Sequence, residues 1–152
     1  MGIRKLIARF VIFTFVAAAS GQQDQHYVVL PQSAGHSVFN LFGKDTRLGS
    51  WQPSKADIDG LEGNLSQISA LSETGFKSTR HIEHPGTYFR QYIGATVNQS
   101  KLIYVNAFCD DPPPPNWKDH LYVVMDGWTC YWQAFYDPAT KKFSSLTING
   151  RA

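Results

Sequence analysis

The sequence lacks the short motifs that mark the common enzyme classes. It contains no G-x-S-x-G nucleophile elbow, no H-E-x-x-H zinc motif, no glycine-rich phosphate loop and no C-x-x-C redox pair. Outside the N-terminus the basic residues form no run, so a nucleic-acid partner or an anionic membrane surface has no electrostatic support. We therefore expect a protein that is not an enzyme, and we predict no cofactor and no metal.

Long apolar runs are also missing, except at the N-terminus. Arg4, Lys5 and Arg9 precede the uncharged run FVIFTFVAAA, and small residues continue to Gly21, which is the layout of a secretory signal peptide. A run of about ten residues is too short to cross roughly 30 Å of hydrocarbon as a helix, so an uncleaved anchor is the weaker alternative. We predict that residues 1–21 are a cleaved signal peptide, and that the mature protein is secreted or periplasmic and not bound to a membrane.

Removing this segment changes the charge of the chain. The whole sequence has 14 basic and 12 acidic residues, and three of the basic residues lie in the predicted signal peptide, which leaves a mature net charge of −1. The remaining length is typical of one domain.

Cysteine is scarce, and its two positions predict a disulfide. A strand that ends at Cys109 and an antiparallel partner that begins near Cys130 would bring the two side chains together, provided that the strands are neighbours in the sheet. Disulfides persist in the compartments that exported proteins reach. The alternative, a catalytic thiol, would need a histidine base placed by the fold.

The segment between the cysteines contains four consecutive prolines, in AFCDDPPPPNWKDH. Each proline fixes φ and limits the conformations of the unfolded chain, as does closure of the 20-residue loop by a disulfide. We expect a stiff, extended surface loop that carries Trp117 on its rim. Recognition of the prolines by a partner domain is the alternative.

The pattern before and after residue 50 differs. Residues 22–50 are poorly patterned, with one short strand expected at 27–30, whereas residues 51–152 indicate an α+β domain. Ser54 with Asp57 is typical of a helix N-terminus. A helix over residues 55–71 is predicted by one apolar stripe, formed by Ile58, Leu61, Leu65 and Ile68.

After residue 86 the hydrophobic period changes to two, and aromatic and β-branched residues become frequent. The segments TYFRQYIGATV, KLIYVNAFC, HLYVV, TCYWQAFY and FSSLTI are predicted strands. The expected fold class is α+β, with one amphipathic helix packed on a four- to five-stranded antiparallel sheet.

Alternation along these strands predicts two unlike faces. If Cys109 points inward, so do Ile103, Val105 and Ala107, followed by Trp132, Ala134 and Tyr136 from the strand after Cys130, with Ile93, Ala95 and Val97 from the first strand. The opposite face is aromatic but polar-tipped, a composition enriched at binding surfaces. The candidate binding residues are Arg90, Tyr92, Tyr104, Asn106, Tyr131 and Gln133, together with Trp117 in the loop. The alternative is that the N-terminal segment or the loop covers this face.

Two groups of side chains contain possible metal ligands, but neither has the spacing of a metal site. His81 and His84 are three residues apart, and in a strand such residues point to opposite faces. A second group matches no calcium-loop spacing, so we interpret it as solvated: Asp110, Asp111, Asp119, His120 and Asp126.

Residues 84–152 resemble small exported bacterial proteins that have no assigned function. The shared marks are a Y-x-R-Q-Y strand at Tyr88, an I-Y-x-N strand at Ile103, D-G before a tryptophan-bearing strand, Y-D at a turn, and N-G-x-A at the end. The helix followed by antiparallel strands is also similar to the cystatin-like arrangement. However, VNQSKL stands where cystatins carry Q-x-V-x-G, so protease inhibition does not follow.

Three functions remain open from the sequence. The first is a non-enzymatic binding or inhibitory module, with another exported or envelope protein as its partner. The second is a small-ligand carrier with a pocket between helix and sheet. The third is a small hydrolase that uses Asp126 or His120.

Overall fold

The structure is a computed structural model that describes residues 26–37, 46–74 and 80–150. The predicted signal peptide, residues 1–21, lies outside these residues.

The predicted helix begins where its cap predicts but is shorter than expected. Helix α1 is Lys55–Gly63, and Ser54 forms a capping box with Asp57. The chain then continues as a 3₁₀ helix, η2, over Leu65–Ala70. The Asn64 side chain donates to the Gly60 carbonyl oxygen at 2.8 Å, a local bond that competes with helix continuation. The predicted stripe nevertheless faces the core, because all four of its residues are buried.

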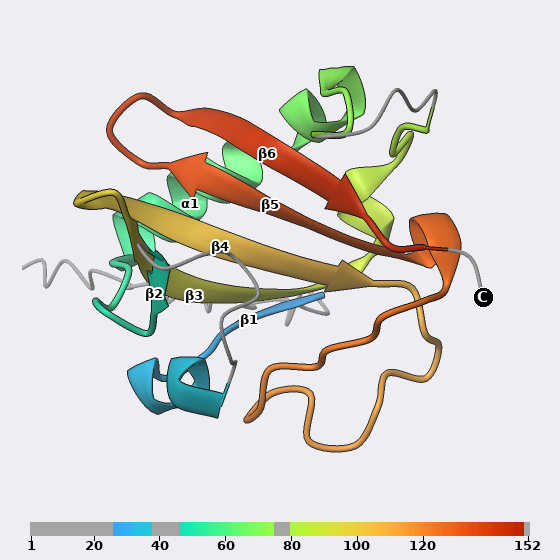
Figure 1. Cartoon of the computed structure of the whole chain (residues 1–152), viewed down its shortest axis with the longest axis horizontal. Coiled ribbons are helices and arrows are strands. Elements are labelled where there is room, and N and C mark those ends of the chain that lie inside the picture. The colour runs from blue at the N-terminus through green and yellow to red at the C-terminus, as the bar shows by residue number, and fades with distance from the viewer. Residues whose placement is uncertain (1–25, 38–45, 75–79, 151–152) are drawn as a thin grey trace, which may run out of the picture.

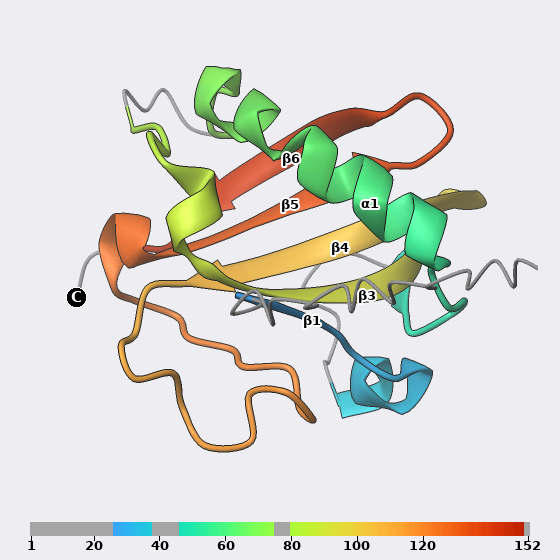
Figure 2. The ribbon, with the colours of Figure 1, turned by 180° about the vertical axis from the view of Figure 1, so that it is seen from behind.

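Four long strands form the antiparallel part of a single sheet. They are β3 (Phe89–Val97), β4 (Ser100–Phe108), β5 (Tyr131–Asp137) and β6 (Lys142–Ile148), paired in chain order. Figure 1 shows them side by side, and Figure 2 shows α1 lying diagonally across one face.

The sheet contains two short strands in addition to the four long ones. Strand β1 (Tyr27–Val29) pairs with β3 in parallel, and β2 (Thr46–Leu48) pairs antiparallel with the other end of β3. The sheet is therefore mixed and six-stranded rather than four- to five-stranded and purely antiparallel. Strands of three residues are too short to produce a recognisable alternation, which is why residues 22–50 carried almost no pattern. The predicted strand HLYVV, residues 120–124, is not a strand, and the backbone of its Tyr122 is bonded to the side chains of Gln91 and Asn106.

The register of the β3–β4 hairpin corrects the predicted faces. Asn98 and Gln99 form a two-residue turn with positive φ, and Val97 pairs with Ser100. Tyr92 therefore pairs with Val105 and Ile93 with Tyr104, so even positions of β3 share a face with odd positions of β4. Ile93, Ala95 and Val97 lie on the face opposite α1, where the sequence analysis had not put them. The predicted inward residues of β4 and β5 do face the helix.

Both faces of the sheet are covered. On the helix side, α1 and η2 pack against a core that includes Tyr92, Val105 and Trp132. On the other side, Leu30 and Ala34, the latter in the 3₁₀ helix η1 (Gln32–Ser37), pack against Ile93, Tyr104 and Phe135. Within the described ranges, no helix is long and apolar enough to cross a membrane.

The β6 edge of the sheet is closed by side chains and backbone from residues 67–74. The Phe143 amide donates to the Gln67 side chain at 3.3 Å, and the Thr74 amide donates to the Leu146 carbonyl oxygen at 2.7 Å. The Ile148 amide donates to the buried Glu73 carboxylate at 3.4 Å. These bonds occupy groups that would otherwise be available to pair with another strand.

Candidate functional site

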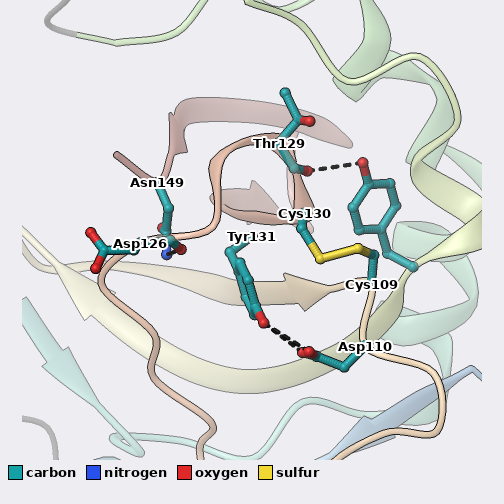
Figure 3. The surroundings of a disulfide bond; sticks show 8 residues. Cys109, Asp110, Asp126, Thr129, Cys130, Tyr131 and Asn149 are labelled. Atoms are coloured by element: carbon teal, nitrogen blue, oxygen red, sulfur yellow. Dashed lines mark hydrogen bonds between the residues drawn. A yellow bond between two sulfur atoms is a disulfide. The ribbon is translucent and has the colours of Figure 1, made fainter. Parts of the chain in front are cut away.

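The loop of residues 110–129 begins and ends at the predicted disulfide, which is present. Phe108 pairs with Tyr131 at the end of β4 and the start of β5, and the next pair outward is Cys109 and Cys130, with Cα atoms 5.0 Å apart. The condition set by the sequence, that the two strands be neighbours, is met. Figure 1 shows the loop in orange at one end of the sheet, and Figure 3 shows the disulfide at its base.

Trp117 fastens the loop and is not an exposed rim, which corrects the sequence prediction. Its side chain is only 7% exposed. Its ring lies 5.4 Å from that of Phe89 and 5.8 Å from that of Phe108, measured between centroids in edge-on geometry. The proline run is therefore followed by an apolar anchor that packs against the ends of β3 and β4.

The side chain of Gln91, the third residue of β3, holds the backbone of the loop. Its amide nitrogen donates to the carbonyl oxygens of Trp117 and His120, the latter at 2.7 Å. Its amide oxygen accepts from the Tyr122 backbone N–H at 2.8 Å and from the Asn106 side chain at 2.9 Å. This fully buried side chain is thus satisfied mainly by the loop's main chain.

The amide contacts continue across the neighbouring strands. Asn106 donates to the Tyr122 carbonyl oxygen at 2.7 Å, and Gln133 donates to Asn106 at 3.4 Å. Gln133 also donates at 3.2 Å to Asn149, whose own amide donates to the carbonyl oxygens of Val124 at 2.5 Å and Asp126 at 2.9 Å. We call this row the amide ladder; its members are Gln91, Asn106, Gln133 and Asn149.

Two further candidate residues, Tyr104 and Tyr131, lie on the same face and are also covered or bonded. Tyr104 is buried against Phe135, with ring centroids 5.5 Å apart, and burial raises its pKa. The half-buried Tyr131 hydroxyl donates to both Asp110 carboxylate oxygens at 2.8 Å, as Figure 3 shows. Desolvation raises the pKa of Tyr131, and the hydrogen bond to the Asp110 carboxylate raises it further.

Arg90 and Tyr92 lie on the opposite face, against the helix. The Arg90 guanidinium pairs with Glu62 of α1 at 3.2 Å and donates to the Tyr92 hydroxyl at 2.9 Å and the Gly86 carbonyl oxygen at 2.9 Å. The Tyr92 hydroxyl itself donates to Glu62, and burial raises the pKa of Tyr92. This buried network joins α1 to β3.

The prediction that the candidate binding residues form one exposed surface is therefore wrong. Arg90, Tyr92 and Tyr104 are all buried, and the first two are separated by the sheet from the third. The alternative in which other parts of the chain cover the aromatic face is confirmed for Tyr104 and Asn106.

The exposed apolar side chains lie elsewhere, in the second half of the loop and at its end. In the part of the chain that the structure describes, the large exposed hydrophobic residues are Val123 at 45%, Met125 at 72% and Trp128 at 43%. Trp128 begins the 3₁₀ helix η4 (Trp128–Cys130), and its amide donates to the Gly150 carbonyl oxygen at 3.0 Å. The Arg80 guanidinium carbon lies 4.7 Å from the centre of the Trp128 ring.

An open hollow of about 450 Å³ lies beside the disulfide. The residues that line it come from the segment before β3 and from the two ends of the loop: Arg80, His81, Glu83, His84, Thr87, Tyr88, Cys109, Trp128 and Thr129. The Tyr88 hydroxyl donates to the Thr129 carbonyl oxygen at 2.9 Å, which links the two walls. We call this space the Trp128 hollow.

A second hollow of about 570 Å³ is lined by Trp51, Lys101 and Asp137 among others. Its two carboxylates already hold local structure. Asp57 accepts from Ser54 in the helix cap, and Asp137 accepts from Ala139 and Thr140 in the β5–β6 turn. Because both carboxylates already accept hydrogen bonds within the chain, the second hollow is the weaker candidate site.

His81 and His84 do not lie in a strand, as the sequence analysis had assumed, and both line the Trp128 hollow. Among the residues that the structure describes, no three His, Cys, Asp or Glu side chains are grouped as ligands of one metal ion. His81 lies 3.5 Å from Glu83, and both side chains are exposed. His120 and Asp126 are exposed as well.

Sequence reasoning missed Gln91, Asn149, Arg80 and Trp128. A signal existed for Gln91, because a buried amide at a strand position needs partners. Comparison of the chain with models of protein families, with curated proteins and with solved structures finds no match.

Proposed function

We propose that this protein is an exported, non-enzymatic binding module whose contact element is the second half of the loop, with Val123, Met125 and Trp128 as its apolar anchors. The observation that carries this proposal is the contrast within one loop. Its backbone is fastened by the amide ladder, Trp117 and a disulfide, yet it leaves these three large apolar side chains in solvent.

Fastening the backbone matters because binding costs conformational entropy. A loop that is already ordered loses little freedom when a partner docks, so more of the contact energy remains as affinity. Tryptophan, methionine and arginine are enriched at the centres of protein interfaces, and here Arg80 lies over the Trp128 ring at 4.7 Å.

If the protein is exported, its partner should be found in the same compartment. The disulfide and the signal-like N-terminus fit an oxidising environment, as does the resemblance to exported bacterial proteins. We propose another exported or envelope protein as the partner, and neither nucleic acid nor a membrane surface.

The other two functions receive less support from the geometry. The space between helix and sheet, where a carrier would hold its ligand, is occupied by packed side chains that include Leu61, Ile68 and Trp132. A hydrolase would need an activated nucleophile, and the nearest candidates, His120 and Asp126, are both exposed to solvent.

The test compares two variants of the mature, oxidised protein. Candidate partners are recovered from envelope extract on immobilised wild-type protein, purified singly, and titrated by calorimetry. Changing both Met125→Ser and Trp128→Ala should weaken binding at least about tenfold, since truncating a central anchor is worth roughly 1.4 kcal/mol or more.

The matched control is Lys142→Ala, an exposed position on β6. It should bind as the wild type does. A purified partner that binds the Met125/Trp128 double variant as tightly as the wild type would overturn the contact element, and the absence of any saturable protein partner would overturn the module itself.

A further inference from the structure

The Trp128 hollow has the dimensions of a small-ligand site. Its volume of about 450 Å³ lies in the lower part of the range for such sites, roughly 300–1,000 Å³. Its walls are held together independently of any ligand, because the disulfide joins Cys109 to Cys130 and the Tyr88 hydroxyl bonds the Thr129 backbone at 2.9 Å. A ligand would therefore enter a largely formed site.

The arginine of the hollow is bonded to buried groups of the protein. Arg80 donates to both oxygens of the buried Glu73 carboxylate, at 3.0 and 2.5 Å, and to the Asn149 carbonyl oxygen at 2.8 Å. Three of its five N–H donors are therefore engaged inside the protein, which leaves less of its fork for a phosphate or carboxylate. Glu83 is exposed on the same side of the hollow, where its carboxylate would repel an anion. The hollow therefore favours a neutral ligand over an anionic one.

The remaining polar groups are suited to hydroxyl groups. His81, His84 and Thr87 on one wall are exposed, and the histidine ring nitrogens can hydrogen-bond a ligand. The Thr87 hydroxyl donates to the His84 carbonyl oxygen at 2.8 Å and keeps lone pairs that can accept. The Tyr88 hydroxyl, already a donor to Thr129, keeps lone pairs that can accept. Ligand hydroxyl groups, which also donate and accept, could bond such a wall in more than one orientation.

Trp128 supplies the apolar side of the hollow. Its ring is 43% exposed and lines the space. A pyranose ring has a C–H-bearing face that packs on an aromatic side chain and a rim of hydroxyl groups that bond polar neighbours. The Arg80 guanidinium carbon lies 4.7 Å from the centre of the Trp128 ring, so a sugar ring would pack on the part of the indole that Arg80 leaves exposed.

We propose that the Trp128 hollow binds a neutral saccharide, with Trp128 as the stacking residue and His81, His84 and Thr87 as hydrogen-bonding groups. This inference goes beyond the proposed function, because it assigns a small ligand to the hollow beside the protein-binding contact element.

The test is a ¹H–¹⁵N NMR titration of the oxidised protein. The probes are cellobiose, maltose, lactose and N,N′-diacetylchitobiose, with glucose 6-phosphate as a charged probe. At least one neutral disaccharide should shift the Trp128 indole N–H signal and saturate below about 20 mM, because a shallow site supports roughly millimolar dissociation constants. Glucose 6-phosphate should bind no more tightly than the neutral sugars.

Variants test the stacking residue against a position outside the hollow, and because the Trp128 variants lack the indole, their binding is followed by the backbone amide signals of the hollow. Trp128→Ala should weaken sugar binding at least tenfold, Trp128→Tyr should retain part of it, and Lys142→Ala, which does not line the hollow, should leave it unchanged. No saturable shift with any probe, tighter binding of the phosphate, or full binding by Trp128→Ala would each overturn the saccharide proposal. Loss of protein-partner binding in the Met125/Trp128 double variant would in that case still support the binding module.

Discussion

Gln91 shows at the residue scale how a polar side chain can be central to a fold. It is the third residue of β3 and is fully buried, at a position where an apolar residue would be expected. Its four hydrogen bonds tie the loop backbone at Trp117, His120 and Tyr122 to β3 and to Asn106. Because three of these bonds go to main-chain groups, the loop is held at this point independently of its own side chains.

Replacing Gln91 with leucine should destabilise the protein. The change keeps the size of the side chain but leaves the Tyr122 amide and the His120 carbonyl group without their partner, and an unsatisfied buried group costs about 1–3 kcal/mol. We expect the free energy of unfolding in urea to fall by about 3 kcal/mol. The control Gln52→Leu, on an exposed position, should change it by less than about 0.5 kcal/mol. Equal stability of Gln91→Leu and wild type would show that the bonds are not formed.

At the scale of single elements, two glycines differ in whether the structure around them has room for a side chain. Gly63 is the last residue of α1, and a Cβ atom added there would meet no heavy atom within 4 Å beyond its own helix. Gly94, in β3, lies where the backbone of residue 51 crosses the sheet, and a Cβ atom there would be 2.0 Å from the Trp51 carbonyl oxygen. The first glycine weakens a helix, whereas the second permits a close approach of two backbones.

Alanine at these two positions should therefore have effects of opposite sign. Gly63→Ala should raise the free energy of unfolding by about 0.5–1 kcal/mol, because alanine is the better helix former. Gly94→Ala should lower it by about 1–3 kcal/mol, since the backbone at Trp51 must move. Urea unfolding measures both. A stable Gly94→Ala variant would contradict the close packing of residue 51 on β3.

At the scale of the whole molecule, both sheet faces are covered, by α1 and η2 on one side and by η1 and the loop on the other. The sequence predicted the helix start, the four long strands and the disulfide, because caps, alternation and cysteine spacing are local signals. It did not predict the face of β3. That depends on whether the Asn98–Gln99 turn has two residues, and a shift of one residue exchanges the faces of the whole strand.

The same limit explains why the candidate binding residues were misjudged. Asn106 and Gln133 were predicted to contact a partner molecule because polar and aromatic residues of this kind are typical of binding surfaces. Their side chains instead form hydrogen bonds within the chain, to the Tyr122 backbone and to neighbouring amides. Several marks of the resemblance to exported proteins have structural roles of this kind. Asn149 holds the loop, and Asp137 caps the β5–β6 turn. Alternation along a strand cannot show what covers a face, since the cover comes from distant parts of the chain.

Hydrogen exchange at the Tyr122 backbone amide tests the central claim, that the loop is fastened across the sheet by the amide ladder. In the oxidised wild-type protein this amide, which donates to Gln91 at 2.8 Å, should exchange at least about 100-fold more slowly than in an unstructured chain. In Gln91→Leu the protection at Tyr122 should be lost, while amides in the centre of β4 remain protected. A wild-type Tyr122 amide that exchanges as fast as in an unstructured chain would contradict a fastened loop, and with it the preorganised contact element.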